Sequence, residues 1–172
     1  MSITISIIIP VYNDPKGLKD TISSLVIQNY PFDKYEIVVI DNGSIDNTLD
    51  VAKEYAGKYP QLVKYAVEDK IQSSYAARNK GIKIANGILI CFIDADMTVN
   101  KNYLTNISDY FDNNRIDYLG CNVKLFPLKI TLTAKYNCIY DFNIETDIYK
   151  NHYSPTCCLT VPQKIFKTVG YF

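Results

Sequence analysis

The chain has 172 residues, of which 48% are apolar and 21% charged, the composition of a one-domain globular protein rather than of a disordered chain. Eighteen basic and eighteen acidic residues cancel to a formal net charge of zero, so no basic excess points to nucleic acid. The N-terminus lacks the charged region and cleavage site of a signal peptide, and every apolar run is far shorter than the roughly 20 residues of a membrane span. We therefore expect a cytoplasmic protein with no nucleic-acid partner and no transmembrane segment in this chain.

Short apolar runs rich in β-branched residues recur along the chain. The runs at 5–11 and 35–40 are continuous, as in parallel strands that are covered on both faces. A weaker run lies at 62–67, and the strongest, at 87–93, leads directly into two aspartates. Each of these runs is predicted to be a strand.

Amphipathic stretches separate the runs, with apolar residues at the three- and four-residue spacing of a helix. Asp46 is the predicted N-cap of the second helix, and Asn86–Gly87 is predicted to end the third. The apolar positions of the four predicted helices are, in order, Leu18, Ile22, Leu25 and Val26; Leu49, Ala52, Tyr55 and Ala56; Ala77, Gly81, Ile84 and Ala85; and Leu104, Ile107 and Phe111.

This alternation of strands and helices predicts an α/β fold, with a mostly parallel sheet flanked by helices and joined by right-handed crossovers. Residues 117–126 and 156–161 are predicted to be later strands, and 162–170 a short helix. Residues 129–155 show no clear period. Because the chain ends directly after the short helix, we expect residues 1–172 to be a single domain that is truncated at its C-terminus.

The five cysteines give no disulfide framework, since their number is odd and no CxxC pair occurs. Cys91 and Cys121 lie in apolar runs, where a thiol acts as a small hydrophobe. The adjacent Cys157 and Cys158 lack the His or Cys partners of a zinc site. We expect these thiols and that of Cys138 to be reduced, as in a cytoplasmic protein.

Polar residues follow three of the predicted strands at the point where each ends. In an open parallel sheet, ligands bind outside the carboxyl ends of the strands, so these residues predict one binding site. Tyr12 offers a ring that can stack on a base, and the Asp41 carboxylate can accept from ribose hydroxyls or a base N–H. The candidate site residues are Pro10, Tyr12 and Asn13 after the first strand, Asp41 and Asn42 after the second, and Asp94, Ala95 and Asp96 after the fourth.

The aspartate pair after the fourth strand predicts a metal site. No glycine-rich turn follows the first strand and no GxxxxGK[ST] loop occurs, so another positive charge must hold any phosphate. Asp94 and Asp96 are two residues apart in extended backbone and are expected to project on the same side, and their hard oxygens favour Mg²⁺ or Mn²⁺. Arg78 and Lys80 are expected to add positive charge from a helix that faces the same edge. A lone DxD is a weak motif, and the other strand ends give it weight.

Four blocks of sequence occur in one order between residues 6 and 172: SIIIPVYND, IVVIDNGSIDNT, AARNKGIKIANGILICFIDADM and LTVPQKIFKTVGYF. Together they resemble the successive blocks of family 2 glycosyltransferases with the Rossmann-like GT-A fold. The resemblance implies transfer of a sugar from a nucleotide diphospho-sugar, most commonly UDP-linked, to an acceptor hydroxyl, usually with inversion. It also implies a carbohydrate or lipid-linked acceptor in polysaccharide or glycolipid synthesis.

The resemblance implies roles for individual residues as well. Asp96 would bind Mn²⁺ or Mg²⁺ bridging the diphosphate, Asp94 would touch the ribose or the metal shell, and Arg78 would lie near the diphosphate. Residues 1–100 would form the nucleotide-binding half, and residues 101–172 the start of the acceptor-side half. The residues assigned to the nucleoside pocket are Pro10, Tyr12 and Asp41.

The catalytic base of the family is a carboxylate in an acidic pair that follows the GYF turn, so we expect it beyond Phe172. The chain is accordingly expected to bind a nucleotide and a metal but to transfer sugar poorly or not at all. Asp141, Glu145 and Asp147 are interpreted as solvated acids, and His152 as a surface or acceptor-loop residue. Peripheral association with a membrane through a further segment stays open.

Three other interpretations fit parts of the sequence. DADMT also fits the DxDxT motif of haloacid-dehalogenase-like phosphatases, but that motif belongs on the first strand of its domain. Asp41 alone would suit a phosphoacceptor receiver domain, although the switch threonine and lysine of such domains cannot be placed. A non-catalytic module that binds a nucleotide sugar is the remaining alternative.

Overall fold

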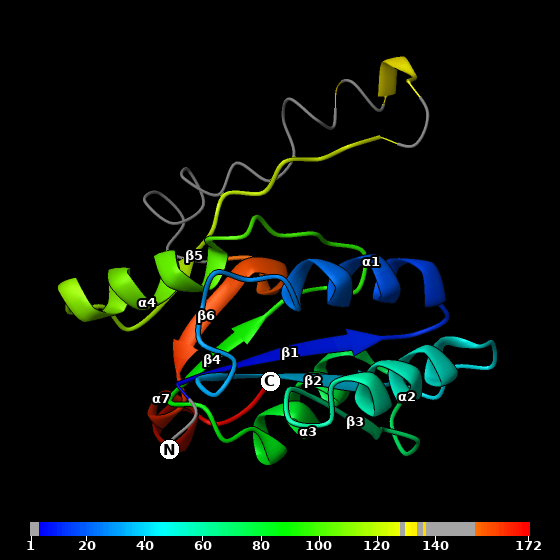
Figure 1. Cartoon of the computed structure of the whole chain (residues 1–172), viewed down its shortest axis with the longest axis horizontal. Coiled ribbons are helices and arrows are strands. Elements are labelled where there is room, and N and C mark those ends of the chain that lie inside the picture. The colour runs from blue at the N-terminus through cyan, green and yellow to red at the C-terminus, as the bar shows by residue number, and fades with distance from the viewer. Residues whose placement is uncertain (1–3, 128–129, 134–135, 137–153) are drawn as a thin grey trace.

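A six-stranded sheet forms the centre of the protein, with the strand order β3-β2-β1-β4-β6-β5 (Figure 1). The computed structural model describes residues 4–127, 130–133, 136 and 154–172. The strands are β1 (Ile5–Val11), β2 (Tyr35–Asp41), β3 (Val63–Val67), β4 (Leu89–Phe92), β5 (Leu119–Gly120) and β6 (Leu159–Pro162).

The predicted mostly parallel α/β sheet is confirmed. β1 pairs in parallel with β2 on one side and with β4 on the other, and β2 pairs in parallel with β3. Every residue of β1, β2 and β4 is buried, as expected for apolar strands covered on both faces. β6 runs antiparallel to both β4 and β5, so it is the one reversed strand of this sheet.

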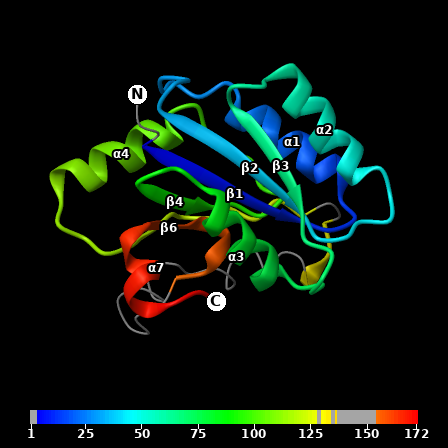
Figure 2. The same cartoon turned by 90° about the horizontal axis from the view of Figure 1, so that it is seen from below.

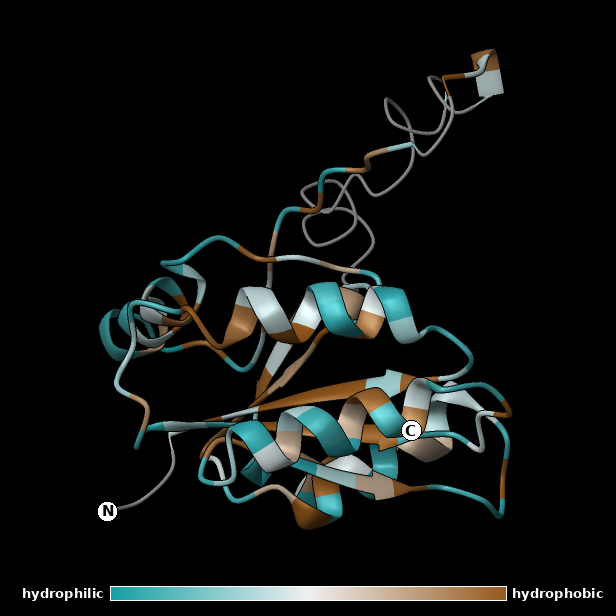
Figure 3. Cartoon of the chain, turned by 45° about the vertical axis from the view of Figure 1, so that its right-hand side comes forward, coloured by the Kyte–Doolittle hydropathy of each residue, from teal (hydrophilic) through white to brown (hydrophobic). Residues whose placement is uncertain are grey.

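Helices cover both faces of the sheet (Figure 2). α1 (Pro15–Leu25), α2 (Thr48–Lys58) and α4 (Tyr103–Asn113) lie on one face, and α3 (Ser74–Ile84) and α7 (Lys164–Val169) lie on the other. A short 3₁₀ turn, η1 (Thr156–Cys158), precedes β6. Figure 3 shows the result: the strands are largely apolar, while the helices turn polar residues outward.

Alternation along β1 supplies both cores. Ile5, Ile7 and Ile9 pack in the core under α1, α2 and α4, whereas Ile8 packs in the core under α3 and α7. Pro10 fits in this central strand because β4 has already ended beside it. The Ile8 carbonyl accepts from Ile93 N at 3.1 Å, so the backbone polar groups of Ile8, and those of Pro10 two residues later, face β4. Because the pairing with β4 ends before Pro10, the N–H group that proline lacks is not needed for the sheet.

Three predictions about local structure need correction. The strand predicted at 117–126 is only β5, two residues long, because it lies at the edge of the sheet and pairs, among the described residues, with the short strand β6 alone. The strand predicted at 156–161 begins as the turn η1 and becomes β6 only at Leu159. Ile84, predicted to be a core position, is 40% exposed in the last turn of α3.

The start of α2 differs from the prediction by one residue. Asn47 is the N-cap residue, and its side chain makes no capping bond. The Asp46 carboxylate instead accepts from Thr48 N at 3.0 Å and from the Thr48 hydroxyl. Asp46 therefore satisfies a free N–H at the start of the helix, but it does so from the residue before the N-cap and not as the N-cap itself.

Candidate functional site

The carboxyl ends of β1, β2 and β4 lie side by side at one edge of the sheet. The loop from β1 to α1 carries Tyr12 and Asn13, the loop after β2 carries Asn42, and the turn after β4 carries Asp94 and Asp96. These strands are neighbours in the sheet although they are far apart in the sequence. The structure thus brings together at one edge the residues that the sequence predicted there.

Tyr12 presents its ring to solvent, since 47% of the residue is exposed. The next residue, Asn13, has a positive φ of 51° and joins the first strand end to the second. Its backbone N–H donates to Ser44 Oγ at 3.0 Å, and its side-chain Oδ1 accepts from Ile45 N at 2.9 Å. Asn13 therefore fixes two loops against each other, and Tyr12 is left free to contact a ligand.

Asp41 closes β2 and is buried, with only 1% of the residue exposed. Its Oδ2 accepts from Ser44 N at 3.1 Å, whereas its Oδ1 is buried and has no partner within the described residues. A buried carboxylate oxygen without a hydrogen bond is costly, so such an atom requires an explanation. A donor from a bound ligand would satisfy it.

Asn42 is engaged within the protein. Its Nδ2 donates to the carbonyls of Glu68, at 3.0 Å, and Ile71, at 2.9 Å. These bonds hold the segment between β3 and α3 against the end of β2. Both donors of the amide are committed in this way, so Asn42 supports the edge of the site.

Asp94 and Asp96 lie in a turn rather than in extended backbone. β4 ends at Phe92, and Met97 N donates back to the Asp94 carbonyl at 3.2 Å. The predicted alternation of a strand therefore does not set the directions of the two side chains. Ala95, between them, is buried, and its carbonyl accepts from Thr21 Oγ1 of α1 at 2.7 Å.

Arg78 of α3 is buried, with 9% of the residue exposed, and its Nη2 donates to Asp94 Oδ1 at 2.7 Å. The Nε of Arg78 is buried without a partner within the described residues. Asp96, two residues beyond Asp94, is exposed and has no hydrogen bond or ion pair within those same residues. One carboxylate of the pair is thus held by an arginine, and the other is free.

Lys80 does not add its charge to the turn at Asp94. Its Nζ contacts the Val67 carbonyl and lies 3.7 Å from Glu68 Oε2. Backbone hydrogen bonds from Lys70 and Ile71, with the nearby ammonium of Lys80, lower the pKa of Glu68. Lys80 therefore belongs to the end of β3.

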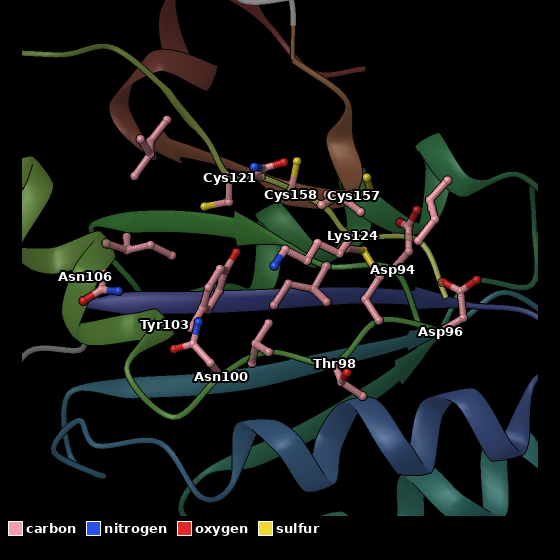
Figure 4. A pocket seen from close by; sticks show the side chains of 18 of the residues that line it. Asp94, Asp96, Thr98, Asn100, Tyr103, Asn106, Cys121, Lys124, Cys157 and Cys158 are labelled. Carbon is pink, nitrogen blue, oxygen red and sulfur yellow. The ribbon is translucent and has the colours of Figure 1, made fainter. Parts of the chain in front are cut away.

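A cavity of about 860 Å³ opens beside the Asp94–Asp96 turn (Figure 4). Its walls come from the turn after β4, from α4, from β5 and the segment after it, and from η1. Sequence periodicity did not indicate this cavity, because residues 117–126 were predicted to be a strand. The polar side chains that line it, beyond the two aspartates, are Thr98, Asn100, Asn106, Asn122 and Lys124, with the tyrosines Tyr103 and Tyr110.

Three thiols line the same cavity: those of Cys121, Cys157 and Cys158. Burial raises the pKa of Cys121 to about 11, so its thiol is neutral at physiological pH. A hydrogen bond between Cys157 and Cys158 raises the pKa of Cys157, together with burial, and lowers that of Cys158. These three cysteines and Cys91 are free, and Cys138 lies outside the described residues.

The donors at the turn suit a hard divalent cation held jointly with a ligand. Within the described residues no cluster of three or more His, Cys, Asp or Glu side chains could cage a metal ion. Mg²⁺ and similar ions take only one or two protein carboxylates and complete their shell with water and phosphate oxygens. Asp96, with the remaining oxygen of Asp94, fits that pattern.

Some predicted features lie outside the described residues, namely Asp141, Glu145, Asp147 and His152. Among the helices that are described, none has the length and apolar character required to cross a membrane.

The family model for glycosyl transferase family 2 matches residues 6–170, and the chain belongs to this family. Glycosyltransferase AglE of Haloferax volcanii is 32% identical over 169 residues, which cover 98% of this chain and 55% of AglE. TarS of Staphylococcus aureus, a poly(ribitol-phosphate) β-N-acetylglucosaminyltransferase, is 31% identical over 119 residues, or 69% of this chain and 21% of TarS. The phosphatase and receiver-domain interpretations are thereby set aside.

Solved structures show the same GT-A fold. A mannosyltransferase from Pyrobaculum calidifontis in complex with GDP-Man and Mn²⁺ matches with a TM-score of 0.78 at 21% identity, over 100% of this chain and 48% of that one. Residues 1–349 of S. aureus TarS with UDP-GlcNAc match with a TM-score of 0.72 at 25% identity, over 99% and 48%. The chain thus spans about half the length of AglE and of these two structures.

Proposed function

We propose that this edge of the sheet binds a nucleotide diphospho-sugar, and that the protein transfers the sugar to an acceptor hydroxyl with inversion. The different environments of the two aspartates carry the proposal. Arg78 Nη2 donates to Asp94 Oδ1 at 2.7 Å, whereas Asp96 is exposed and has no partner within the described residues. A free carboxylate next to a fixed one is suited to bind a cation together with a diphosphate. UDP is the donor nucleotide we favour, because TarS, at 25% identity, forms a complex with UDP-GlcNAc.

The nucleoside would occupy the ends of β1 and β2. Tyr12 offers an exposed ring for the base, with Pro10 in the strand behind it, and Asp41 Oδ1 offers an unsatisfied acceptor for a base N–H or a ribose hydroxyl. Residues 1–100 make up this nucleotide-binding half. Because Asn13 and Asn42 are engaged in loop-to-loop bonds, their part is to keep this pocket in shape.

The diphosphate would lie at the turn after β4. Asp96 would hold Mn²⁺ or Mg²⁺, Asp94 would contact the ribose or the metal shell, and Arg78 would supply a permanent positive charge nearby. When bound, the cation neutralises the charge that develops on the nucleoside diphosphate as the glycosidic bond breaks. Arg78 is nine-tenths buried, so its charge acts where solvent screens it least.

The acceptor would approach through the cavity on the side of residues 101–172. Its walls carry amides, tyrosines and one lysine, the kinds of groups that hydrogen-bond and stack on sugars. We propose a carbohydrate or lipid-linked acceptor, in line with the poly(ribitol-phosphate) polymer named for TarS. Free thiols and a fold without a described membrane-spanning helix suit action in the cytoplasm, alone or at a membrane surface.

A thermal-shift screen tests the donor site. The chain is melted with UDP, GDP or CMP, each with and without Mn²⁺, beside Asp96→Asn and a control, Asp112→Asn, which changes an exposed aspartate of α4 outside the cavity. A nucleotide at about 100 times its dissociation constant should stabilise the fold by about 2.7 kcal/mol, a shift on the order of 5–10 °C for this length.

We expect one nucleotide to give a Mn²⁺-dependent shift that Asp96→Asn abolishes and Asp112→Asn preserves. A Mn²⁺-dependent melting-temperature shift that persists in Asp96→Asn would show that Asp96 does not bind the metal. No shift with any of the nucleotides would refute the donor site. Release of UDP from UDP-GlcNAc, measured with and without a polyol-phosphate acceptor, then tests transfer itself, which is expected to be poor or absent in residues 1–172 alone; acceptor-dependent release would contradict that expectation and exclude a module that only binds.

A further inference from the structure

Polar residues occupy buried positions on one side of α1 and in the turn after it, where an amphipathic helix usually has apolar residues. Thr21 and Ser24 lie three residues apart in α1 and so share one face, and Gln28, past the end of the helix, donates from its Nε2 to the Ser24 carbonyl at 3.0 Å; we call these three residues the α1 stripe. Thr21 is fully buried and Gln28 nearly so. Since buried polar groups are costly unless they are hydrogen-bonded, their partners matter.

The partners of the α1 stripe lie in the segment that follows β4. Thr21 Oγ1 donates to the Ala95 carbonyl at 2.7 Å, and Ser24 Oγ accepts from Val99 N at 3.2 Å. Gln28 Nε2 donates to the Asn100 carbonyl at 2.8 Å, while its Oε1 accepts from Leu104 N at 3.1 Å. The stripe thus contacts this segment at four points, from the residue between the two aspartates to the first turn of α4.

Gly17 brings the helix into direct contact with the same turn. A Cβ at this position would lie 2.7 Å from the Ala95 carbonyl oxygen and 2.1 Å from Asp14 Oδ2, so no larger residue fits without displacing the turn. Gly17 precedes Thr21 by four residues and lies on the same side of α1. The turn therefore has the helix on one side and the cavity, with Asp94 and Asp96, on the other (Figure 4).

We propose that the α1 stripe is a positioning element for the carboxylates of Asp94 and Asp96. The sheet does not fix this turn, because β4 ends before it, and its own backbone bond runs from Met97 N to the Asp94 carbonyl. Thr21 holds the peptide between the two aspartates and so sets the direction in which each side chain leaves. This inference rests on the proposed function, in which Asp96 holds the metal.

The consequence is a measurable effect on metal affinity. Mg²⁺ demands a near-ideal arrangement of its oxygen ligands, and removing a group that orients a ligand typically weakens metal binding by roughly 10- to 100-fold. Thr21→Val keeps the shape of the side chain and removes its hydroxyl. Thr21→Ser restores the hydroxyl and removes only a methyl group.

The experiment measures the Mn²⁺ dissociation constant by electron paramagnetic resonance of free Mn²⁺, with UDP or GDP present. Thr21→Val and Thr21→Ser are compared with the unaltered chain and with Ser23→Ala. Ser23 is the matched control, because it lies on the same helix but hydrogen-bonds Tyr55 Oη of α2 at 2.7 Å. Ser24→Ala serves as a second variant should Thr21→Val not fold. Amide hydrogen exchange over residues 95–100, without metal, gives a second readout.

We expect the Mn²⁺ dissociation constant to rise about 10-fold or more in Thr21→Val, to rise in the same direction in Ser24→Ala, and to stay within about twofold in Thr21→Ser and Ser23→Ala. Amide hydrogen exchange at residues 95–100 should be faster in Thr21→Val and unchanged in Thr21→Ser and Ser23→Ala. Mn²⁺ affinity that is unchanged in both Thr21→Val and Ser24→Ala, or lowered equally in Ser23→Ala, would overturn the inference and leave the proposed function intact. If the unaltered chain binds no Mn²⁺ with either nucleotide, the proposed function itself fails, and the inference with it.

Discussion

Arg78 reaches from α3 to the end of β4, where its Nη2 donates to Asp94 Oδ1 at 2.7 Å. The side chain of Arg78 is 10% exposed and that of Asp94 is 39% exposed, so the pair joins a buried cation to a carboxylate at the cavity wall. A guanidinium stays charged at every physiological pH, and its planar fork orients a carboxylate well. The pair therefore fixes one of the two aspartates of the turn before any ligand arrives.

Replacing Arg78 by methionine is expected to weaken nucleotide binding. Met keeps much of the length of the side chain but removes the charge that orients Asp94 and faces the proposed diphosphate. A hydrogen bond to a charged group contributes about 1.5–3 kcal/mol, so the dissociation constant for UDP with Mn²⁺ should rise about 10- to 100-fold. Isothermal titration calorimetry measures it.

Arg115 provides the matched control, because it is exposed and lies after α4, away from the residues that line the cavity. Arg115→Met removes the same charge from the chain and should leave the dissociation constant within about twofold, since a distant surface charge is screened by salt. Equal losses in the two variants would point to the net charge of the chain rather than to the contact with Asp94.

Tyr12→Ala is expected to weaken nucleotide binding without altering the stability of the fold. The residue is 47% exposed and belongs to neither core, so removal of its ring leaves no cavity in them. Stacking of a base on an aromatic ring contributes about 1–3 kcal/mol, which corresponds to about a 5- to 150-fold loss of affinity. Fluorescence titration with UDP and Mn²⁺ would show the loss, whereas Tyr12→Phe should bind like the unaltered chain. A Tyr12→Ala variant that binds normally would remove this residue from the nucleoside pocket.

The order of strands and helices was predictable because burial leaves a period in the sequence. Residues 5–11 and 35–40 are almost wholly apolar, with Ser6 and Glu36 as the exceptions, and both runs lie in strands buried on two faces. The same reasoning placed Asp41 and the turn after β4 at one edge, since parallel strands end together. The prediction of a strand at 117–126 was wrong in length, because the edge strand β5 has only two residues and leaves no detectable period in the sequence.

The supporting contacts were not predictable in the same way. Thr21 and Ala95 are 74 residues apart, and nothing local in the sequence marks a hydrogen bond between them. Asn13 and Asn42 were expected to meet a ligand, because a polar residue at a strand end has the same pattern whether it binds a ligand or another loop. Only the tertiary structure shows that each of them also bonds to another loop, and their contact with a ligand stays a prediction.

Asp41→Asn is expected to separate binding from stability. The unpaired, buried Oδ1 of Asp41 disfavours the fold when no ligand is present, whereas a neutral amide is cheaper to bury. The melting temperature of the ligand-free variant should therefore equal or exceed that of the unaltered chain, while the shift caused by nucleotide and Mn²⁺ should fall by more than half. A lower melting temperature together with a full nucleotide shift would show that Asp41 has a structural role only.

Glu36 forms a buried network at the opposite ends of the strands. Its Oε1 accepts from Ser6 Oγ and from Asn86 N, each at 2.6 Å, and its Oε2 accepts from Lys64 Nζ at 2.6 Å. Burial would raise the pKa of Glu36, but the bonds from Lys64, Ser6 and Asn86 outweigh it and lower the pKa. Because this network lies away from the candidate site, its loss should change stability and not binding.

Glu36→Gln should destabilise the fold in a pH-dependent manner. The isosteric amide keeps the bonds from Ser6 and Asn86 but turns a donor toward Lys64, at a cost of about 1–3 kcal/mol near neutral pH. The pKa of Glu36 is lower in the folded state, so its contribution is complete above the ordinary glutamate pKa of about 4.3 and is lost as the pH falls through the folded-state value. Urea unfolding at pH 7 and below pH 4 should therefore show a difference in the free energy of unfolding between the two proteins that narrows at acidic pH.

Glu54→Gln, at an exposed position on α2, is the control and should show no such gap at either pH. A Glu36→Gln gap of constant size across this range would mean that the carboxylate charge contributes nothing to the network.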